Sequence, residues 1–247
     1  MIEIDKLVKN YEGFTAVDEL SLRVEPGEIL GLVGPNGAGK TSTLRCLAGI
    51  IPMTSGAIRI CGHDIVTSPI ESRRGLAFVP DEPHLFDHLT AWDHMTLFAR
   101  IYGVADAEQR AASLLAENDL AQQHHAFPGE LSRGMKQKLI ISCALLHEPR
   151  ALIFDEPLTG LDPGSMRRTK RTIRRTAEGG AAVIVSSHML HLVEEVCHRI
   201  LVLQHGKKIL EGTLAEIRAG VPDLAVDADL EEIFLRATGQ DDEAGNP

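Results

Sequence analysis

The chain has 247 residues, of which 44% are hydrophobic and 24% charged, with a formal net charge of −10. This length suits one large domain or a core with an inserted subdomain, and no apolar run approaches the roughly 20 residues that cross a bilayer. The four cysteines are scattered without a CxxC pair, which fits free thiols in a reducing cytosol and excludes a disulfide framework. Any work at a membrane would therefore require a partner.

The negative charge is concentrated at one end, where residues 221–247 hold eight acidic residues and one arginine. The rest of the chain is nearly neutral, whereas broad nucleic-acid binding needs basic surface that neutralises phosphates. We therefore expect no nucleic-acid partner. The acidic stretch Asp241–Glu243 is expected to be a solubilising, disordered end.

Before residue 90 the sequence predicts short strands separated by turns, at residues 2–8, 28–33, 57–60 and 75–79. The run EILGLV at 28–33 is a compact apolar segment, which is typical of a buried parallel strand. A helix is expected to follow it, from about residue 39 to 48.

Between residues 90 and 147 the pattern becomes helical. Thr90 can cap a first helix and Asp106 a second, because short polar side chains accept hydrogen bonds from the first turn. A third helix is expected from Ser132 to His147. This block predicts an all-helical insertion.

Strand–helix alternation then resumes, with strands at 151–155, 181–186 and 199–203 and helices after Pro163 and His188. Alternation of this kind implies a parallel sheet with helices on both faces. The last stretch contains the amphipathic segment DLEEIFLRATG, which predicts a small appended helix.

The motif GPNGAGKT begins at Gly34, between the apolar strand and the helix that follows it. A loop that wraps around phosphates must turn its backbone N–H groups inward, and glycines permit the positive φ values that this requires. Lys40 can reach the β- and γ-phosphates, and the hydroxyl of Thr41 can ligate Mg²⁺. The motif therefore predicts a site for ATP and its magnesium ion.

The run ALIFDE ends with two carboxylates, Asp155 and Glu156, at the C-terminal end of a predicted strand. Ligands bind at that edge of open α/β sheets. Asp155 can hold magnesium through its water shell, and Glu156 can orient or deprotonate an attacking water. Downstream of a P-loop, this pair predicts hydrolysis of ATP.

The motif LSRGM places Ser132 at the start of the third helix of the insertion. A serine hydroxyl, the amide of Gly134 and a helix N-terminus together form an anion site. The sequence therefore holds a second phosphate-binding element, outside the P-loop and inside the helical insertion.

In their order and spacing, these motifs resemble the ATP-binding-cassette family, specifically the nucleotide-binding subunits of bacterial export-type ABC transporters. The resemblance covers about the first 220 residues. It implies a Walker A loop at 34–41, a Walker B motif ending in Asp155 and the catalytic Glu156, and the LSGGQ signature at 131–135.

The resemblance also implies roles for single residues. Tyr11 matches the aromatic residue that stacks on adenine, with Val17 nearby. Asp162 matches the loop that communicates across a dimer, and His188 the switch histidine that contacts the γ-phosphate. The implied nucleotide-binding residues are Tyr11, Val17, Gly34, Asn36, Gly37, Ala38, Gly39, Lys40, Thr41 and Ser42. The implied catalytic residues are Lys40, Glu156 and His188, the signature residues are Ser132, Arg133 and Gly134, and the magnesium ligands are Thr41, Asp81 and Asp155.

The predicted fold class is α/β: a P-loop NTPase core with a mixed or parallel sheet and flanking helices, an inserted all-helical subdomain, and an antiparallel β element on the N-terminal side. The expected ATP-binding core spans residues 1–89 and 148–220. The helical signature subdomain spans 90–147, and an acidic helix and tail span 221–247.

The chain departs from the family pattern in two motifs. Asp81 occupies the position usually held by glutamine, where a carboxylate can still ligate Mg²⁺ but lacks the amide donor and adds negative charge near Glu156. In the signature, Arg133 replaces a glycine and Met135 replaces a glutamine. We expect the aspartate to slow turnover or shift its pH dependence, and the remaining signature serine to preserve contact with the γ-phosphate.

The resemblance implies a head-to-tail dimer, with each ATP between the Walker A loop of one domain and the signature serine of the other. It further implies a transmembrane permease on a separate chain, a homodimer or a heterodimer with another ABC subunit, and a cytoplasmic, peripheral location on the membrane. Two alternatives stay open: a soluble ABC ATPase of translation or DNA maintenance, and a slowly hydrolysing regulatory module, which Asp81 favours.

Two charged patterns have simpler interpretations. Five arginines fall at helical spacing after Pro163 and predict a solvated helix face. They are Arg167, Arg168, Arg171, Arg174 and Arg175. A zinc site built around His188, His191, Glu195 and His198 is disfavoured, because His188 already has a role by motif.

Overall fold

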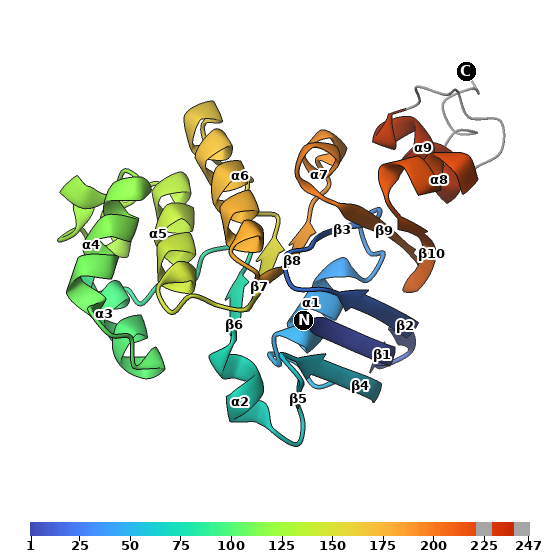
Figure 1. Cartoon of the computed structure of the whole chain (residues 1–247), viewed down its shortest axis with the longest axis horizontal. Helices are drawn as coiled ribbons and strands as arrows, with labels where there is room; N and C mark the ends of the chain where they lie inside the picture. The colour runs from blue at the N-terminus through green and yellow to red at the C-terminus, as the bar shows by residue number, and fades with distance from the viewer. Residues whose placement is uncertain (221–228, 240–247) are drawn as a thin grey trace.

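The computed structural model describes residues 1–220 and 229–239. Its strands form two sheets, a four-stranded sheet in the order β2-β1-β4-β5 and a six-stranded sheet in the order β10-β9-β3-β8-β7-β6. Helices α3, α4 and α5 stand to one side of them (Figure 1). The strands are β1 Ile2–Tyr11, β2 Phe14–Val24, β3 Ile29–Val33, β4 Ser55–Ile60, β5 His63–Asp64, β6 Leu76–Val79, β7 Ala151–Asp155, β8 Ala182–Ser186, β9 Arg199–Gln204 and β10 Lys207–Gly212. The helices are α1 Lys40–Leu47, α2 Pro69–Arg74, α3 Ala91–Tyr102, α4 Ala107–Glu117, α5 Arg133–Leu145, α6 Pro163–Glu178, α7 Leu190–Val196, α8 Leu214–Gly220 and α9 Leu230–Thr238.

The six-stranded sheet is parallel except at one edge. Strands β6, β7, β8, β3 and β9 run parallel, and only β10 pairs antiparallel with its neighbour. The segments ILGLV, ALIFD and AVIVS of β3, β7 and β8 are buried at every position. Parallel strands with both faces covered consist of near-continuous apolar residues, so the predicted central strands are confirmed.

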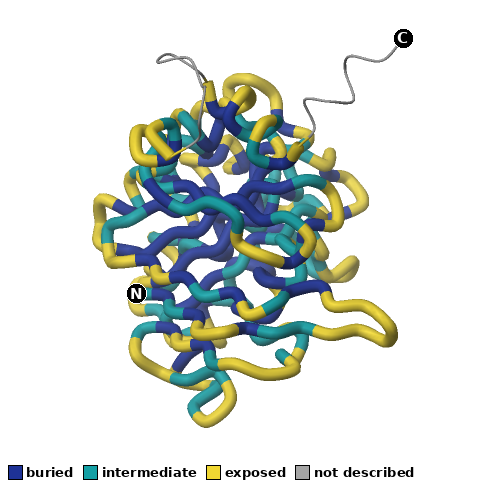
Figure 2. The backbone as a smooth tube through the Cα atoms, turned by 90° about the vertical axis from the view of Figure 1, so that its right-hand side faces the viewer, coloured by how far each residue is buried: buried dark blue, intermediate teal, exposed yellow. Residues whose placement is uncertain are grey.

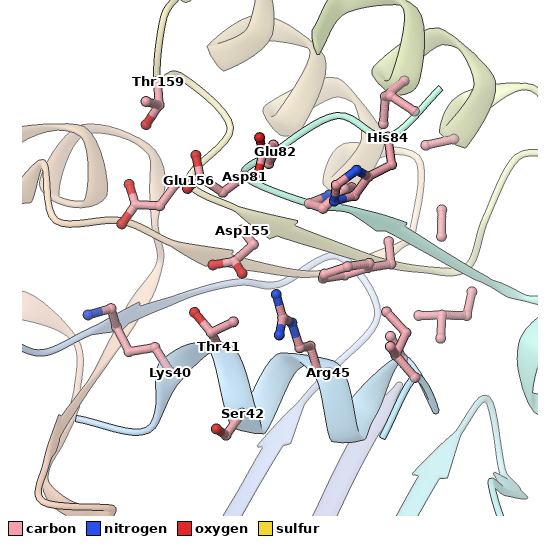
Figure 3. Close-up of a pocket in the computed structure, with 18 of the residues that line it drawn as sticks. Lys40, Thr41, Ser42, Arg45, Asp81, Glu82, His84, Asp155, Glu156 and Thr159 are labelled. Carbon is pink, nitrogen blue, oxygen red and sulfur yellow. The ribbon is translucent and has the colours of Figure 1, made fainter. Parts of the chain in front are cut away.

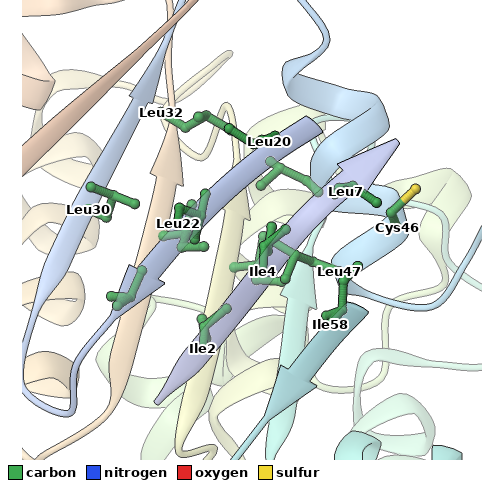
Figure 4. Packing of buried hydrophobic residues seen from close by; sticks show 14 of the residues in the cluster. Ile2, Ile4, Leu7, Leu20, Leu22, Leu30, Leu32, Cys46, Leu47 and Ile58 are labelled. Carbon is green, nitrogen blue, oxygen red and sulfur yellow. The ribbon is translucent and has the colours of Figure 1, made fainter. Parts of the chain in front are cut away.

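Two hydrophobic layers enclose this sheet. On one face, Leu30, Leu32 and Ile153 pack with α1 and the inner face of the antiparallel sheet, including Ile4 and Leu20 (Figure 4). On the other face, a second cluster joins the sheet to α5, α6 and α7. Buried backbone accordingly runs through the middle of the molecule, with exposed turns around it (Figure 2).

The helical insertion has a core of its own. Met95 of α3, Leu115 of α4 and Leu139 of α5 are almost fully buried against one another. Thr90 caps α3 in a reciprocal capping box with Asp93, as the sequence predicts a cap there. Asp106 occupies the N-cap of α4 but adopts a left-handed conformation with φ 51°, and within the described chain its side chain makes no capping hydrogen bond.

Several elements were not predicted. The N-terminal region is a hairpin of two long strands joined at Gly13 (φ 75°), rather than the one strand expected over residues 2–8. Edge strand β10 and the short helix α2 were also missed. Exposed and half-buried positions interrupt the buried ones along β2, and polar residues at most of those positions weaken the apolar signal on which strand prediction depends.

Near the C-terminus, the amphipathic segment forms α9 as predicted. Asp229 caps it and Gly239 ends it in a left-handed conformation. Leu230 and Ile233 are fully buried in a cluster with residues of β9 and α7. The acidic stretch 241–243 lies outside the described residues. Among the described helices, none combines the length and the apolar character needed to span a bilayer.

Candidate nucleotide-binding site

A cleft of about 1080 Å³ opens at the carboxyl ends of the parallel strands. The loops after β3, β6, β7 and β8 supply its wall, because parallel strands end at the same edge of a sheet. The side chains of Lys40 and Thr41 from α1, Asp81 from the loop after β6, and Asp155 and Glu156 from the end of β7 face this common space (Figure 3). The structure thus brings together three of the predicted motifs.

The shape of the P-loop depends on its glycines. Gly37 and Gly39 have φ values of 80° and 103°, in the left-handed region. An added Cβ at Gly39 would lie 2.3 Å from the carbonyl oxygen of Ala16, and one at Gly34 would lie 2.3 Å from that of Leu203. Larger residues at these two positions would push the loop away from β2 and β9.

Lys40 begins α1 and points back along the loop. Its Nζ donates to the carbonyl oxygens of Gly34 at 2.6 Å and Pro35 at 3.1 Å. Partial burial lowers the pKa of Lys40, while the nearby carboxylates of Glu156 and Asp155 oppose that shift. The ammonium group therefore lies between the loop and the carboxylates at the end of β7, where it can bind a phosphate.

Asp155 ends β7 and is almost fully buried. The Ser186 hydroxyl donates to its Oδ1 at 2.6 Å and fixes the carboxylate. Burial raises the pKa of Asp155, and Asp81 adds to that shift, whereas the Ser186 hydrogen bond, Arg45 and Lys40 oppose it. A buried carboxylate with another acidic group nearby is suited to a divalent cation, and the hydroxyl of Thr41 adds a third hard oxygen. This donor set fits Mg²⁺.

Glu156 follows directly and is held by the end of β8. Its N–H donates to the carbonyl of Ser186 at 3.1 Å, and its φ of 50° turns the chain away from the strand. The backbone N–H of His188 donates to Oε1 at 2.9 Å, and Nδ1 of His188 lies 2.8 Å from Oε2. The structure therefore brings the predicted catalytic glutamate and histidine into direct contact at the cleft.

The expected adenine side lies at the ends of β1 and β2. Tyr11 ends β1, is 46% exposed and has Lys9 Nζ 4.8 Å from its ring centroid. Phe14, its register partner on β2, lines the cleft and is 58% exposed. The Val17 side chain is fully buried in the core, and Ala16 lines the cleft beside it. Stacking by Tyr11 stays a prediction, and Phe14 is a second aromatic candidate.

The signature motif lies outside the cleft. Ser132 caps α5, with its Oγ accepting from the N–H of Met135 at 3.2 Å, and is exposed together with Arg133. Gly134 is packed against the chain itself, since an added Cβ would lie 3.0 Å from the carbonyl oxygen of Gly160. The signature residues Ser132, Arg133 and Gly134 are thus not among the residues that line the cleft.

Asp162 caps α6 and precedes the first turn of that helix. The backbone N–H of Ser165 donates to its Oδ1 at 3.0 Å, and the Ser165 hydroxyl donates to Oδ2. These hydrogen bonds lower the pKa of Asp162 to about 2. The carboxylate consequently stays ionised near neutral pH.

Some cleft residues were not predicted. Arg45 lies one helical turn after Thr41 on α1, so an i, i+4 spacing could have placed both on one face. His84 and Thr159 come from loops without a periodic pattern. No sequence signal would have identified those two.

Three of the five arginines at helical spacing on α6 form ion pairs: Arg174 contacts Glu195, Arg175 contacts Glu117, and Arg168 contacts Asp119. Lys170 on the same helix also contacts Glu195. Across residues 1–220 and 229–239, no cluster of His, Cys, Asp and Glu is arranged to hold a metal by itself. Of the residues at helical spacing after β8, Glu195 pairs with Lys170 and Arg174, and Nδ1 of His198 accepts from the backbone N–H of Ile29 at 3.0 Å.

Comparisons with known proteins agree with these motifs. A family model described as ABC transporter matches residues 17–159. The chain is 38% identical over 235 residues to Nod factor export ATP-binding protein I of Paraburkholderia xenovorans (strain LB400), covering 94% of this chain and 76% of that protein.

Two solved structures share the fold. One, described as the ATP binding subunit of an ABC transporter, has a TM-score of 0.91 at 33% identity and covers 96% of this chain and 99% of that chain. A dimeric post-hydrolysis cassette bound to ADP and Pi has a TM-score of 0.79 at 23% identity, covers 87% of this chain and 99% of that chain, and shows a likeness of fold alone. The expected P-loop NTPase architecture is confirmed, and this chain belongs to the ABC transporter family as an ATP-hydrolysing, ATP-binding subunit.

Proposed function

We propose that this subunit hydrolyses Mg-ATP to power an exporter and that it acts as one half of a dimer. The observation that carries the proposal is the convergence of the P-loop, Asp155 and the Glu156–His188 pair on one cleft. Export as the direction is supported by the relative from Paraburkholderia xenovorans, which is named an export ATP-binding protein.

In this proposal the cleft residues have separate tasks. The P-loop N–H groups and Lys40 bind the phosphates. Glu156 accepts a proton from the attacking water or orients it. Its carboxylate is held in one direction, because the backbone N–H of His188 contacts Oε1 and the Nδ1 of the same residue contacts Oε2. His188 is 63% exposed, so its ring can reach a γ-phosphate while it holds Glu156.

Thr41, Asp81 and Asp155 would hold the magnesium ion. Their oxygens are the hard ligands that Mg²⁺ prefers, and Ser186 sets the orientation of Asp155 before any ligand arrives. When bound, the ion neutralises charge on the phosphates during phosphoryl transfer.

A second cassette completes the site. The exposed hydroxyl of Ser132 and the N-terminus of α5 form an anion-binding surface that lies outside the cleft. A head-to-tail partner, either another copy of this chain or a related cassette, would bring this surface to the open side of the nucleotide. Asp162, ionised at the start of α6, would contact the partner beside it.

The membrane part of the exporter is expected on a separate chain, a permease bound at the cytoplasmic face. Support comes from apolar residues that line the cleft after α1 and on α3, namely the exposed Ile50 together with Phe98 and Tyr102. Apolar surface next to a nucleotide site suits a protein partner. A nucleic-acid partner is not expected.

A regulatory module that binds ATP and hydrolyses it slowly is the second candidate. The observation that favours it is Asp81, which adds negative charge close to Asp155 in the cleft. Steady-state ATPase rates of the wild type and of Glu156→Gln separate the two: a rate abolished by the substitution supports the motor, and equal, near-zero rates support the regulator.

The test of the assembly is capture of tagged Glu156→Gln protein with Mg-ATP from detergent-solubilised membranes of its source organism. A stoichiometric membrane protein with several spans is the expected partner. Recovery of ribosomes, nucleic acid or soluble proteins alone would overturn the transport function. In parallel, light scattering should show an ATP-dependent dimer of Glu156→Gln that Ser132→Arg prevents.

A further inference from the structure

Two of the three positions at which this chain departs from its family pattern, Asp81 and Arg133, contact each other. Nη2 of Arg133 lies 3.3 Å from Oδ1 of Asp81, although 52 residues separate them. Arg133 belongs to the signature motif at the start of α5, and Asp81 lines the nucleotide cleft after β6. This ion pair therefore connects the signature surface to the cleft within one subunit.

The backbone around the pair is arranged to keep Arg133 in place. Its side-chain stem crosses Gly160, where an added Cβ would lie 3.2 Å from Cδ of Arg133. Gly160 has a φ of 78°, so a glycine suits both the conformation and the close approach. The stem thus runs from α5 across the loop before α6 to Asp81.

A second contact holds the cleft edge independently of Arg133. Gln137, one turn further along α5, is almost fully buried, and its Nε2 donates to the carbonyl oxygen of Pro80 at 3.3 Å. The backbone before Asp81 is therefore anchored to α5. The side chain of Asp81 remains able to change partners, because its ion pair is half exposed.

We propose that Arg133 is a positioning residue that competes with Mg²⁺ for Asp81 and thereby sets how strongly the metal tightens ATP binding. The inference rests on the proposed Mg-ATP site. In the subunit without nucleotide, Arg133 neutralises Asp81 and directs it toward the signature. When Mg-ATP binds, Asp81 would turn toward the metal and leave the guanidinium of Arg133 unpaired beside Ser132. Binding of nucleotide in the cleft would thereby change the charge next to the signature serine.

The strength of the pair fits an exchange of partners. Its side chains are 55% and 48% exposed, and exposed ion pairs are weak enough for a divalent cation to displace them. Such a pair shifts the metal equilibrium by roughly two- to fivefold rather than blocking it. A buried pair at this position would instead exclude the metal.

The test measures ATP affinity by calorimetry with saturating Mg²⁺ and with EDTA, in a Glu156→Gln background that prevents turnover. The ratio of the two dissociation constants is the factor by which Mg²⁺ tightens binding. Arg133→Met keeps an unbranched stem over Gly160 but removes the charge, and should raise this factor roughly two- to fivefold. Arg133→Lys, which retains a charge, should stay closer to the parent value.

Two controls isolate the pair. Arg171→Met removes one positive charge from an exposed position on α6 and should leave the factor unchanged. Asp81→Asn should lower the factor, and adding Arg133→Met to it should then have no further effect. Affinity in EDTA, expected to be similar in all variants, reports that each has folded.

Equal factors for Arg133→Met and Arg171→Met, or the same increase with and without Asp81, would overturn the inference while leaving the ATP site intact. If the parent protein bound no ATP, the proposed function itself would fall. The two failures are therefore distinguishable.

Discussion

Nδ1 of His188 lies 2.8 Å from Oε2 of Glu156, while the backbone N–H of the same histidine donates to Oε1 at 2.9 Å. Both carboxylate oxygens are thus held by one residue at the end of β8. Glu156 is only 15% exposed, whereas His188 is 63% exposed. The histidine can therefore sense a ligand in the cleft and orient the glutamate behind it.

Replacing His188 with alanine should slow hydrolysis without preventing ATP binding. Loss of the ring leaves Glu156 with fewer contacts that fix its direction, and positioned proton transfer contributes about 10²- to 10⁴-fold to rates. We expect a fall in kcat of that order with little change in ATP affinity. His191→Ala, on an exposed position of α7, is the matched control. Turnover that survives His188→Ala would contradict the assignment.

The two left-handed glycines of the P-loop should differ in tolerance. Gly37→Ala places a Cβ that meets no atom of the described residues within 4 Å, so only the backbone penalty of about 1 kcal/mol is expected. Gly39→Ala adds a 2.3 Å clash with the Ala16 carbonyl. Urea denaturation should show a larger loss of unfolding free energy for Gly39→Ala, together with loss of ATP binding. Equal costs would mean that the loop moves freely away from β2.

Ser132 has a structural task and a proposed binding task, and two substitutions separate them. Ser132→Ala removes the cap on α5 and should cost about 1 kcal/mol of unfolding free energy. Ser132→Asn keeps a good capping residue, so stability should be nearly retained. Both should weaken ATP-dependent dimerisation measured by light scattering. A fully stable Asn variant that dimerises like the wild type would remove the serine from the interface.

Asp162 should contribute to stability in a defined pH window. Hydrogen bonds from Ser165 lower its folded pKa from 3.8 to about 2. Because the shift favours the ionised form, its contribution is fully present above the unfolded pKa and is lost as pH falls through the folded one. The difference in Tm between wild type and Asp162→Ala should therefore be largest above about pH 4 and shrink toward about pH 2. A difference that grows on acidification would contradict this origin.

The sequence by itself determined the chemistry of the motifs and the central elements that carry them. Apolar runs such as EILGLV and ALIFD predicted strands that are buried at every position, because a strand covered on both faces needs no polar residue. The P-loop and the Asp155–Glu156 pair are local patterns at the ends of such strands. Their meeting at one edge follows from parallel topology.

Only the tertiary structure decided which side chains face one another. Hairpin pairing placed Phe14 at the cleft, and packing of β2 against the parallel sheet buried Val17 in the core. Packing of α5 against the loop after β6 joined Arg133 to Asp81 across 52 residues. Contacts between residues far apart in sequence depend on how whole elements pack, because a local pattern fixes the type of an element and not its neighbours.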